Sequence, residues 1–599
     1  MQNQILTSIS GKSYQKTRVD ERMALAISQK FDLDLCVARV LSSKNLVNLE
    51  ENFGNDFSEI ENFLKPTIKA SLPNPFDLLD MDKAVSKIVK IIKNKQKITI
   101  FGDYDVDGAT SSALLKRFFD AIGVSCNIYI PDRILEGYGP NTEAFLNLKK
   151  QGTDLVVTVD CGTVAFGPLE AASKAGLDVI VIDHHIGAFE NPPAIAIVNP
   201  NRLDEESPHK NLAAVGVSFL LAVAINKTLR EEGFYVKTPE PNLMNFLDLV
   251  ALGTVCDVMS LTGLNRAFVC VGLKIMKKRG NIGIRSLFDV AGLDEEPSAY
   301  HLGFVIGPRI NAGGRVGKAS LGAKLLSTND QNEAQVIAEE LNHHNQNRKD
   351  IEVDILSEAK SAFEKNHQDH SVLIAASSNW HQGVIGIVAS RIKDLYQKPT
   401  IIIAINNKIG KASCRSISGV DFGSAIVKAK LEGLLIEGGG HKMAGGFSVH
   451  EEKLEDLQKF FNDELAKTVE ISRANHTNEV IDILDINSAN LKLAKELSSL
   501  EPFGAGNSKP RFIIQDLKIV EAKIVGKDGK HVRCVFSAKT LAGWMGRIVG
   551  FAFNAMESDI GPVLISKNKG KSVAVSGQIN INKWMGNENL QLVIEDLFR

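Results

Sequence analysis

Three short apolar runs in this chain each end directly in acidic residues, and this pattern constrains the fold more than any other. The runs cover residues 98–101, 155–159 and 179–182, and they lead into Asp103-Tyr-Asp105-Val-Asp107, Asp160 and Asp183-His184-His185. Short runs rich in Val and Ile, separated by helical patterns at 84–93, 110–119 and 169–175, are typical of parallel strands buried on both faces. The sequence therefore predicts an α/β domain built on a parallel sheet, with a further strand near 127–130.

Acidic and histidine side chains are predicted to gather at one edge of this sheet. The carboxyl ends of parallel strands lie side by side, which places five aspartates and two histidines in one crevice. Clustered carboxylates repel one another unless cations neutralise them, and oxygen ligands with imidazole suit Mn²⁺ or Mg²⁺ better than Zn²⁺. Two such ions about 4 Å apart activate water and stabilise both oxygens at phosphorus, so we expect phosphoester hydrolysis.

A simpler interpretation applies to each of these residues alone. An aspartate that follows a strand often only caps a helix or forms a turn. Paired histidines are commonly surface residues, and we expect this of His343 and His344 in a later helical segment. The combination of three strand ends favours the metal site.

The 599 residues are too many for one hydrophobic core. We expect an N-terminal segment at 1–75, the parallel-sheet domain at 76–326, a connecting helix at 327–365, a smaller α/β domain at 366–472 and a β-barrel domain at 473–599. The connecting helix is predicted because 333–363 has helical apolar spacing without glycine or proline. Five short strand patterns at 511–514, 518–524, 531–536, 572–579 and 590–594 indicate an OB-like barrel.

Composition limits where the chain works and how it binds its partners. The net charge is −2, so any nucleic acid must bind local basic surfaces rather than a basic field over the whole protein. Seven scattered cysteines without a C-x-x-C pair argue against a thiolate zinc site and favour a reducing compartment. Residues 1–22 lack a signal peptide's apolar core, and no apolar run reaches the ~18 residues of a membrane helix. We expect a soluble, cytoplasmic protein.

At Asp183-His184-His185 the sequence resembles the DHH phosphoesterase family. Residues 103–108, 158–162 and 253–257 are similar to its first, second and fourth motifs. The resemblance implies a binuclear Mn²⁺ or Mg²⁺ site with the ligands Asp105, Asp107, Asp160, His184 and Asp257, which Asp103, Asp183 and His185 would support or extend. Several family members carry a histidine four residues before an aspartate of the first motif; here that position is Phe101, which leaves the ligands of one metal open.

Within the family, four further segments resemble the RecJ exonucleases: 307–315, 380–391, 438–446 and 501–507. Of these, 380–391 and 438–446 resemble parts of an accessory (DHHA1) domain. The residues that we expect to bind substrate are Arg309, Asn311, Arg315, His381, Arg415, Ser416, Gly439, Gly440 and His441. Arginine forks and glycine backbone amides suit phosphate oxygens. The resemblance implies that Arg309, Arg415, Ser416 and His441 hold the 5′-terminal phosphate and so set 5′→3′ polarity. Any one of these arginines or glycines would otherwise serve a surface ion pair or a tight turn.

The C-terminal region has a local excess of basic residues. Residues 509–533 contain seven Lys or Arg against three Asp or Glu, and Lys567, Lys569, Lys571 and Trp584 follow. Such residues would track a single strand and stack a base, although basic residues on strands are usually only solvated.

We therefore predict a single-stranded-DNA-specific 5′→3′ exonuclease that releases 5′-mononucleotides by two-metal catalysis in DNA repair and recombination. A helicase and a single-strand-binding protein are the expected protein partners. Two alternatives stay open: a DHH phosphodiesterase of cyclic dinucleotides or short oligonucleotides, and a non-enzymatic binding subunit that retains a nuclease fold. Metal preference, processivity, selectivity against RNA and oligomeric state are not determined by the sequence.

Overall fold

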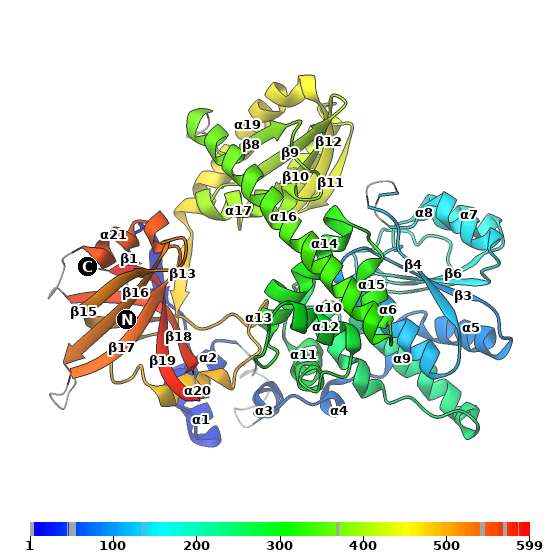
Figure 1. Cartoon of the computed structure of the whole chain (residues 1–599), viewed down its shortest axis with the longest axis horizontal. Coiled ribbons are helices and arrows are strands. Elements are labelled where there is room, and N and C mark those ends of the chain that lie inside the picture. Colours follow the sequence, from blue (N-terminus) through cyan, green and yellow to red (C-terminus); the bar gives the residue numbers. More distant parts are fainter. Residues whose placement is uncertain are drawn as a thin grey trace. The chain divides into compact units, whose positions relative to one another are not determined.

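The chain forms two units, each with its own hydrophobic core (Figure 1). One unit is Ile68–Ala474, and the other combines Met1–Thr67 with Asn475–Arg599. The computed structural model describes residues 5–44, 46, 56–133, 136–137, 139–366, 370–539, 545–566, 572–584 and 586–598. Lys567, Lys569, Lys571 and the Trp584 side chain lie outside this description.

A five-stranded parallel sheet is the centre of the first domain of Ile68–Ala474. Its order is β4 (Cys126–Tyr129), β3 (Ile98–Gly102), β5 (Leu155–Val159), β6 (Asp178–Ile182) and β7 (Ala196–Val198). Alternate strand residues enter different cores. Val157 packs in the large core with α5 (Met81–Lys93), α6 (Val106–Ala121), α9 (Ala214–Glu231) and α10 (Leu247–Cys256). Val156 packs in a smaller core with α7 (Thr142–Lys150) and α8 (Phe166–Lys174). Both faces are therefore covered by helices, which explains why the strands are continuously apolar.

The helices of this domain are α4 (Ile68–Ser71), α5 (Met81–Lys93), α6 (Val106–Ala121), α7 (Thr142–Lys150), α8 (Phe166–Lys174), α9 (Ala214–Glu231), α10 (Leu247–Cys256), α11 (Gly263–Met276), α12 (Ile282–Val290), α13 (Ala299–His301), α14 (Gly307–Val316) and α15 (Leu321–Ser327). The predicted connecting helix is α16, Gln331–Asn366. His343 is exposed on it and His344 is partly buried.

The second domain of this unit has a mixed five-stranded sheet in the order β11-β12-β10-β9-β8. Its elements are β8 (Leu373–Ser377), α17 (Ile385–Tyr396), β9 (Thr400–Asn406), β10 (Ile409–Arg415), α18 (Phe422–Leu431), β11 (Glu437–His441), β12 (Ala444–His450) and α19 (Leu454–Ala474). Glu352 of α16 is buried and pairs with Arg348 on its own helix and Arg391 on α17, which ties this domain to the helix.

The C-terminal region forms the predicted OB-like barrel. Strands β14 (Asp482–Leu484), β15 (Phe512–Val525), β16 (His531–Lys539), β17 (Met545–Ala552), β19 (Asn587–Phe598) and β18 (Ser572–Trp584) follow in this order, and β15 also pairs with β18. The predicted strands at 511–514 and 518–524 are parts of one strand, β15. The sequence did not indicate β17, because Gly546 and Gly550 weaken its strand pattern.

The N-terminal segment packs on this barrel, which the sequence did not predict. Its elements are β1 (Leu6–Thr7), β2 (Ser13–Lys16), α1 (Glu21–Phe31), α2 (Leu35–Ser42) and α3 (Ser58–Leu64). Strand β2 pairs with β13 (Thr477–Val480), and Asp482 accepts from Lys16 at 2.7 Å and from Arg39. Ile27 and Leu41 share a core with barrel residues and with α20 (Leu491–Ser498) and α21 (Ile560–Ile565).

Among the described residues, no helix is both long enough and apolar enough to cross a bilayer.

The shared core predicts that a cavity in the N-terminal segment loosens the C-terminal barrel. Leu41 is fully buried, so Leu41→Ala should lower the free energy of unfolding of this unit by about 2–5 kcal/mol. Hydrogen exchange should accelerate at β15 and β16 amides but not at β3 and β5 amides. Leu25→Ala is the matched control, because Leu25 is 52 % exposed and should change stability by less than about 0.5 kcal/mol. Unchanged hydrogen exchange at the barrel amides in Leu41→Ala would show that the N-terminal segment and the barrel do not share one core.

Candidate metal centre and arginine pocket

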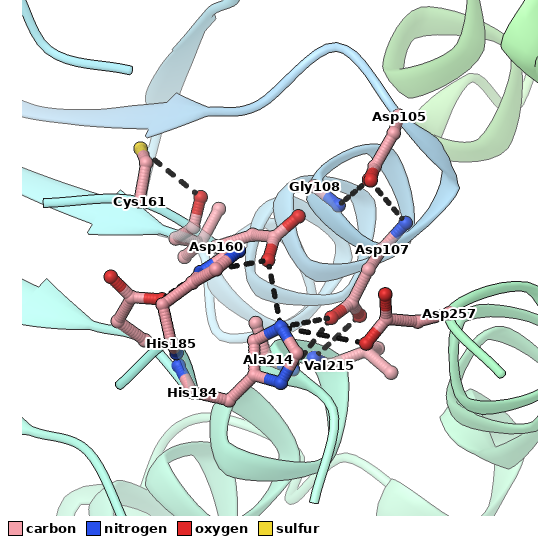
Figure 2. A network of polar contacts seen from close by, with 12 residues as sticks. Asp105, Asp107, Gly108, Asp160, Cys161, His184, His185, Ala214, Val215 and Asp257 are labelled. Atoms are coloured by element: carbon pink, nitrogen blue, oxygen red, sulfur yellow. Dashed lines mark hydrogen bonds and ion pairs between the residues drawn. The ribbon is translucent and has the colours of Figure 1, made fainter. Parts of the chain in front are cut away.

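The acidic residues predicted from the three strand ends do meet at one place. Figure 2 shows Asp107, Asp160 and Asp257 around the His184 ring. From His184 Nε2, the nearest carboxylate oxygens of Asp160, Asp257 and Asp107 lie at 3.3, 3.4 and 3.8 Å. Within the described chain, three groups bring ligand atoms within 4.8 Å of one another: Asp160-His184-His185, Asp107-His184-Asp257 and Asp103-Asp105-Asp160.

Burial makes this cluster electrostatically costly without a cation. Burial, followed by repulsion from neighbouring carboxylates, raises the pKa of Asp107 to about 7 and that of Asp257 to about 9. The same causes raise the pKa of Asp160 well above its usual range. Asp103 Oδ1 is buried and accepts no hydrogen bond within the described chain. Carboxylates crowded together in this way fit a divalent cation, which would neutralise their charge.

The two histidines have opposite protonation tendencies. Burial, together with the charge of His185, lowers the pKa of His184 to about 4, so His184 is a neutral imidazole suited to metal binding. Burial also opposes a charge on His185, but its hydrogen bond to Asp183 outweighs this and raises its pKa to about 9. His185 Nδ1 lies 2.8 Å from Asp183 Oδ1, and Asp183 Oδ2 accepts from the Thr163 amide at 3.0 Å. Asp183 therefore fixes the orientation of His185.

Helix starts position two of the carboxylates. Asp105 is the N-cap of α6 and accepts from the amides of Asp107 and Gly108. Asp107 accepts from the amides of Ala214 and Val215 at 2.6 and 2.9 Å, so it caps α9, which has no capping side chain of its own. The positive end of that helix stabilises the buried charge of Asp107.

The backbone is strained next to two of the expected ligands. Asp160 has φ 61° directly after β5, and Val258 has φ 58° directly after Asp257. A left-handed conformation is costly for a β-branched residue and is found where the surrounding structure imposes it. A Cβ on Gly253 would lie 2.4 Å from Thr110 Oγ1 and 3.0 Å from Asp107 Oδ1, so only glycine lets α10 carry Asp257 this close.

Two asparagines that the sequence did not single out hold the Asp183-His184-His185 loop. Asn199 donates to Thr163 Oγ1 and to the His185 carbonyl, both at 2.8 Å. Asn201 donates to the His184 carbonyl at 2.6 Å. Both follow β7, the next strand of the sheet, so their position after a strand end was an available signal. Phe101 packs against Tyr129 and Phe145 in the smaller core, which includes residues of α7 and α8.

An arginine-rich pocket of about 400 Å³ lies beside the cluster. Arg133, Arg315, Arg415 and Lys411 line it, and no described lining residue is acidic. Burial, followed by the charges of Arg133, Arg348 and Arg415, lowers the pKa of Arg315 to about 10. Arginines that lie together, partly buried and without a carboxylate, fit an anion, and their forks match phosphate.

The other substrate-binding candidates have different surroundings. His381 Nδ1 accepts from the Gly383 amide at 3.1 Å, and Arg315 donates to the Gly383 carbonyl at 3.2 Å. Arg309 donates to Asn342 and to the Val305 carbonyl, and Ser416 is buried and donates to the Val420 carbonyl. These two do not line the arginine pocket, and neither do Asn311 on α14 and Gly439, Gly440 and His441 on β11.

The sequence missed Arg133 and Tyr104 as pocket residues. Arg133 Cζ lies 5.0 Å from the centre of the Tyr104 ring, in a cation–π contact. Neither residue stands in a pattern that indicates anion binding, because the pocket forms only when segments from two domains meet.

Comparisons with known proteins agree with this architecture. Three family models match: the DHH family, N-terminal domain, at 97–254; the DHHA1 domain at 369–467; and the RecJ OB domain at 482–596. The single-stranded-DNA-specific exonuclease RecJ of Haemophilus influenzae is 34 % identical, over 89 % of this chain and 92 % of that protein. Its counterpart from Bacillus subtilis is 30 % identical, over 97 % of this chain and 70 % of that protein.

Solved structures give the same result. The crystal structure of RecJ in complex with Mn²⁺ from Thermus thermophilus matches with a TM-score of 0.75 at 26 % identity. The match covers 98 % of this chain and 79 % of that one.

The raised pKa values predict how stability depends on pH without divalent cations. Asp107 and Asp257 bind protons more tightly when folded than in the unfolded chain, where aspartate titrates near about 4. Their contribution is complete below about pH 4 and is lost as pH rises through about 7 and about 9. The melting temperature of EDTA-treated protein should therefore fall across this range, and excess Mn²⁺ should restore it.

Asp257→Asn should weaken this pH dependence and Mn²⁺ binding together, as measured by calorimetry. Asp248→Asn is the matched control: Asp248 is also buried, with a pKa that burial raises to about 6, but it lies outside the three ligand groups. Mn²⁺ affinity should survive in that variant. An equal loss of Mn²⁺ affinity in Asp257→Asn and Asp248→Asn would contradict the assigned metal centre.

Proposed function

The chain belongs to the RecJ exonucleases of the DHH family, and we propose that it hydrolyses single-stranded DNA from the 5′ end, releasing 5′-mononucleotides. Membership of this family makes it a metal-dependent hydrolase that acts on phosphodiester bonds. Direction, product and the number of metal ions are the parts that we propose here.

One observation carries the proposal: the anion pocket and the carboxylate cluster are joined by one residue. Tyr104 lines the arginine pocket and stands between Asp103 and Asp105, which both belong to the cluster. A terminal phosphate held by Arg133, Arg315 and Arg415 would therefore place the next phosphodiester of the same strand near the carboxylates. A 5′-terminal phosphate in this pocket gives 5′→3′ polarity.

The residues of the cluster would have different roles at that phosphodiester. Asp105, Asp107, Asp160, His184 and Asp257 would hold two Mn²⁺ or Mg²⁺ ions, which supply Lewis-acid stabilisation of charge at phosphorus. Asp183 bonds to His185 Nδ1 and so holds the His185 ring in place beside the cluster. Asp107 stays in place through its two helix amides, which limits reorganisation during the reaction.

We also propose that the C-terminal barrel binds single-stranded DNA. Part of its basic excess is neutralised, since Lys523 pairs with Glu521, Lys530 with Glu557 and Arg511 with Glu595. Lys518, Lys527 and Arg533 are further basic residues of the same stretch. OB-type barrels bind single strands through such basic surfaces together with stacking.

We also propose a cytoplasmic role in DNA repair and recombination, in which a helicase and a single-strand-binding protein provide the substrate. All seven cysteines are unpaired thiols, which favours a reducing compartment. The preference for single strands follows from the family of the relatives above.

Purified protein with Mn²⁺ should shorten 5′-phosphorylated single-stranded DNA labelled at its 3′ end, stepwise from the 5′ end. Asp160→Asn should reduce the rate by about three orders of magnitude, because metal catalysis supplies several kcal/mol. Denaturing gels with time points measure this, and a duplex of the same sequence is the substrate control. Cleavage of dinucleotides without cleavage of long strands would instead favour a small-substrate phosphodiesterase.

Arg415→Gln should remove the preference for a 5′-phosphate. A charge-assisted hydrogen bond is worth about 1.5–3 kcal/mol, so kcat/KM for 5′-phosphorylated strands should fall about 10- to 100-fold. Strands with a 5′-hydroxyl should be much less affected. Arg473→Gln is the matched control, because Arg473 lies at the end of α19 and not in the pocket. An equal loss on both substrates would contradict a terminal-phosphate site.

A further inference from the structure

The arginine pocket continues beyond Arg415 along one face of strand β10. Lys411, Ser413 and Arg415 alternate with the buried Ala412 and Cys414, so all three point to the same side of the sheet. All three line the arginine pocket. A strand rises about 3.3 Å per residue, so this face presents a donor about every 7 Å.

A second groove of about 480 Å³ adjoins the pocket at its Lys411 end. The two spaces share Lys411, Ala412 and Gly446 as lining residues. Gly446 pairs with Ser413 on one side and with Gly439 on the other, so β12 and β11 present no side chain at these two positions, whereas Ser448 stands opposite Lys411. The arginine pocket thus continues into the second groove at Lys411 and Gly446.

The lining of the second groove suits phosphate groups better than a nucleobase. Lys411 and Lys430 supply two positive charges there. Its one aromatic lining residue, Phe447, is 5 % exposed and belongs to the domain core, so it offers no stacking face. Binding of a base in a single strand usually needs such a face.

A carboxylate also lines this space. Glu437 lines the second groove, and its Oε1 accepts from Ser448 Oγ at 2.9 Å. Its negative charge repels an anion, so the outer phosphates of a 5′-terminal chain would lie at the Lys411 side chain, which lines both spaces, rather than against Glu437.

We infer that this site accepts strands with a 5′-diphosphate or 5′-triphosphate end, whose outer phosphates lie against Lys411. This inference rests on the proposed exonuclease function and names a further substrate class for the same site. In the reaction, water adds to the phosphorus that links the first two nucleotides, and the 3′-oxygen of the first nucleotide leaves with a proton. The first product is then a nucleoside 5′-triphosphate, with its anhydride bonds intact.

The test compares strands of one sequence that carry a 5′-triphosphate, a 5′-monophosphate or a 5′-hydroxyl, labelled at the 3′ end. The wild-type protein should cleave the triphosphate strand with a kcat/KM within about tenfold of the monophosphate strand, and chromatography should identify the nucleoside triphosphate as product. Asp160→Asn protein, which turns over slowly, should bind the triphosphate strand at least as tightly in fluorescence anisotropy.

Two substitutions make the test specific, because one removes a positive charge and the other removes a negative charge from the groove. Lys411→Gln should lower the ratio of triphosphate to monophosphate kcat/KM about tenfold, and Lys411→Arg should restore it, since one charge-assisted contact is lost and regained. Glu437→Gln should raise the same ratio about two- to fivefold, because it removes a like charge from the lining of the groove.

The outcomes separate the two claims. Degradation of the monophosphate strand with a blocked triphosphate strand would overturn the inference and leave the exonuclease function standing. A Lys411→Gln loss that is equal on both strands would also overturn it, because Lys411 would then serve the first phosphate alone. Failure to degrade any strand would remove the proposed function itself.

Discussion

Asp103, Asp107 and Asp160 are buried side by side at the carboxyl ends of parallel strands, where their charges repel one another and lack water. Much of the surrounding structure offsets this repulsion. The first amides of α9 bind the Asp107 carboxylate, and His185 Nδ1 bonds to the Asp183 carboxylate beside the cluster. The remaining negative charge is what a divalent cation would neutralise, so the fold is adapted to the bound state.

The arginine pocket presents the same problem with the opposite sign. Arg133, Arg315 and Arg415 share a space without a described carboxylate, while the nearby Arg348 is neutralised by the buried Glu352. Glu352 thus stabilises the junction between α16 and α17 and leaves the pocket cationic. The acidic cluster and the arginine pocket therefore lie next to each other, joined at Tyr104. Together they suit an anionic ligand that contacts metal cations at the cluster and arginines in the pocket. A phosphodiester strand with a terminal phosphate has this character.

Sequence reasoning succeeded where a local pattern carries the information. The strands at 155–159 and 179–182 were found because both faces of each strand are apolar, and Asp160 and Asp183 follow them directly. It failed where a contact joins distant segments. Arg133 carries no local sign of anion binding, Ala214 and Val215 contribute only backbone amides, and the pairing of β2 with β13 joins segments more than 450 residues apart, as in Glu479 with Gln15.

The sequence by itself determined the parallel sheet, the long helix, the barrel and the identity of the acidic cluster, since periodicity and strand-end positions are local properties. Only the tertiary structure decided which arginines face one another and which are used elsewhere. Arg391 and Arg415 look alike in the sequence, yet one is paired with Glu352 and the other lines an open pocket. The physical reason is that the charge state of a site depends on partners brought by packing, and these come from segments that no local pattern connects.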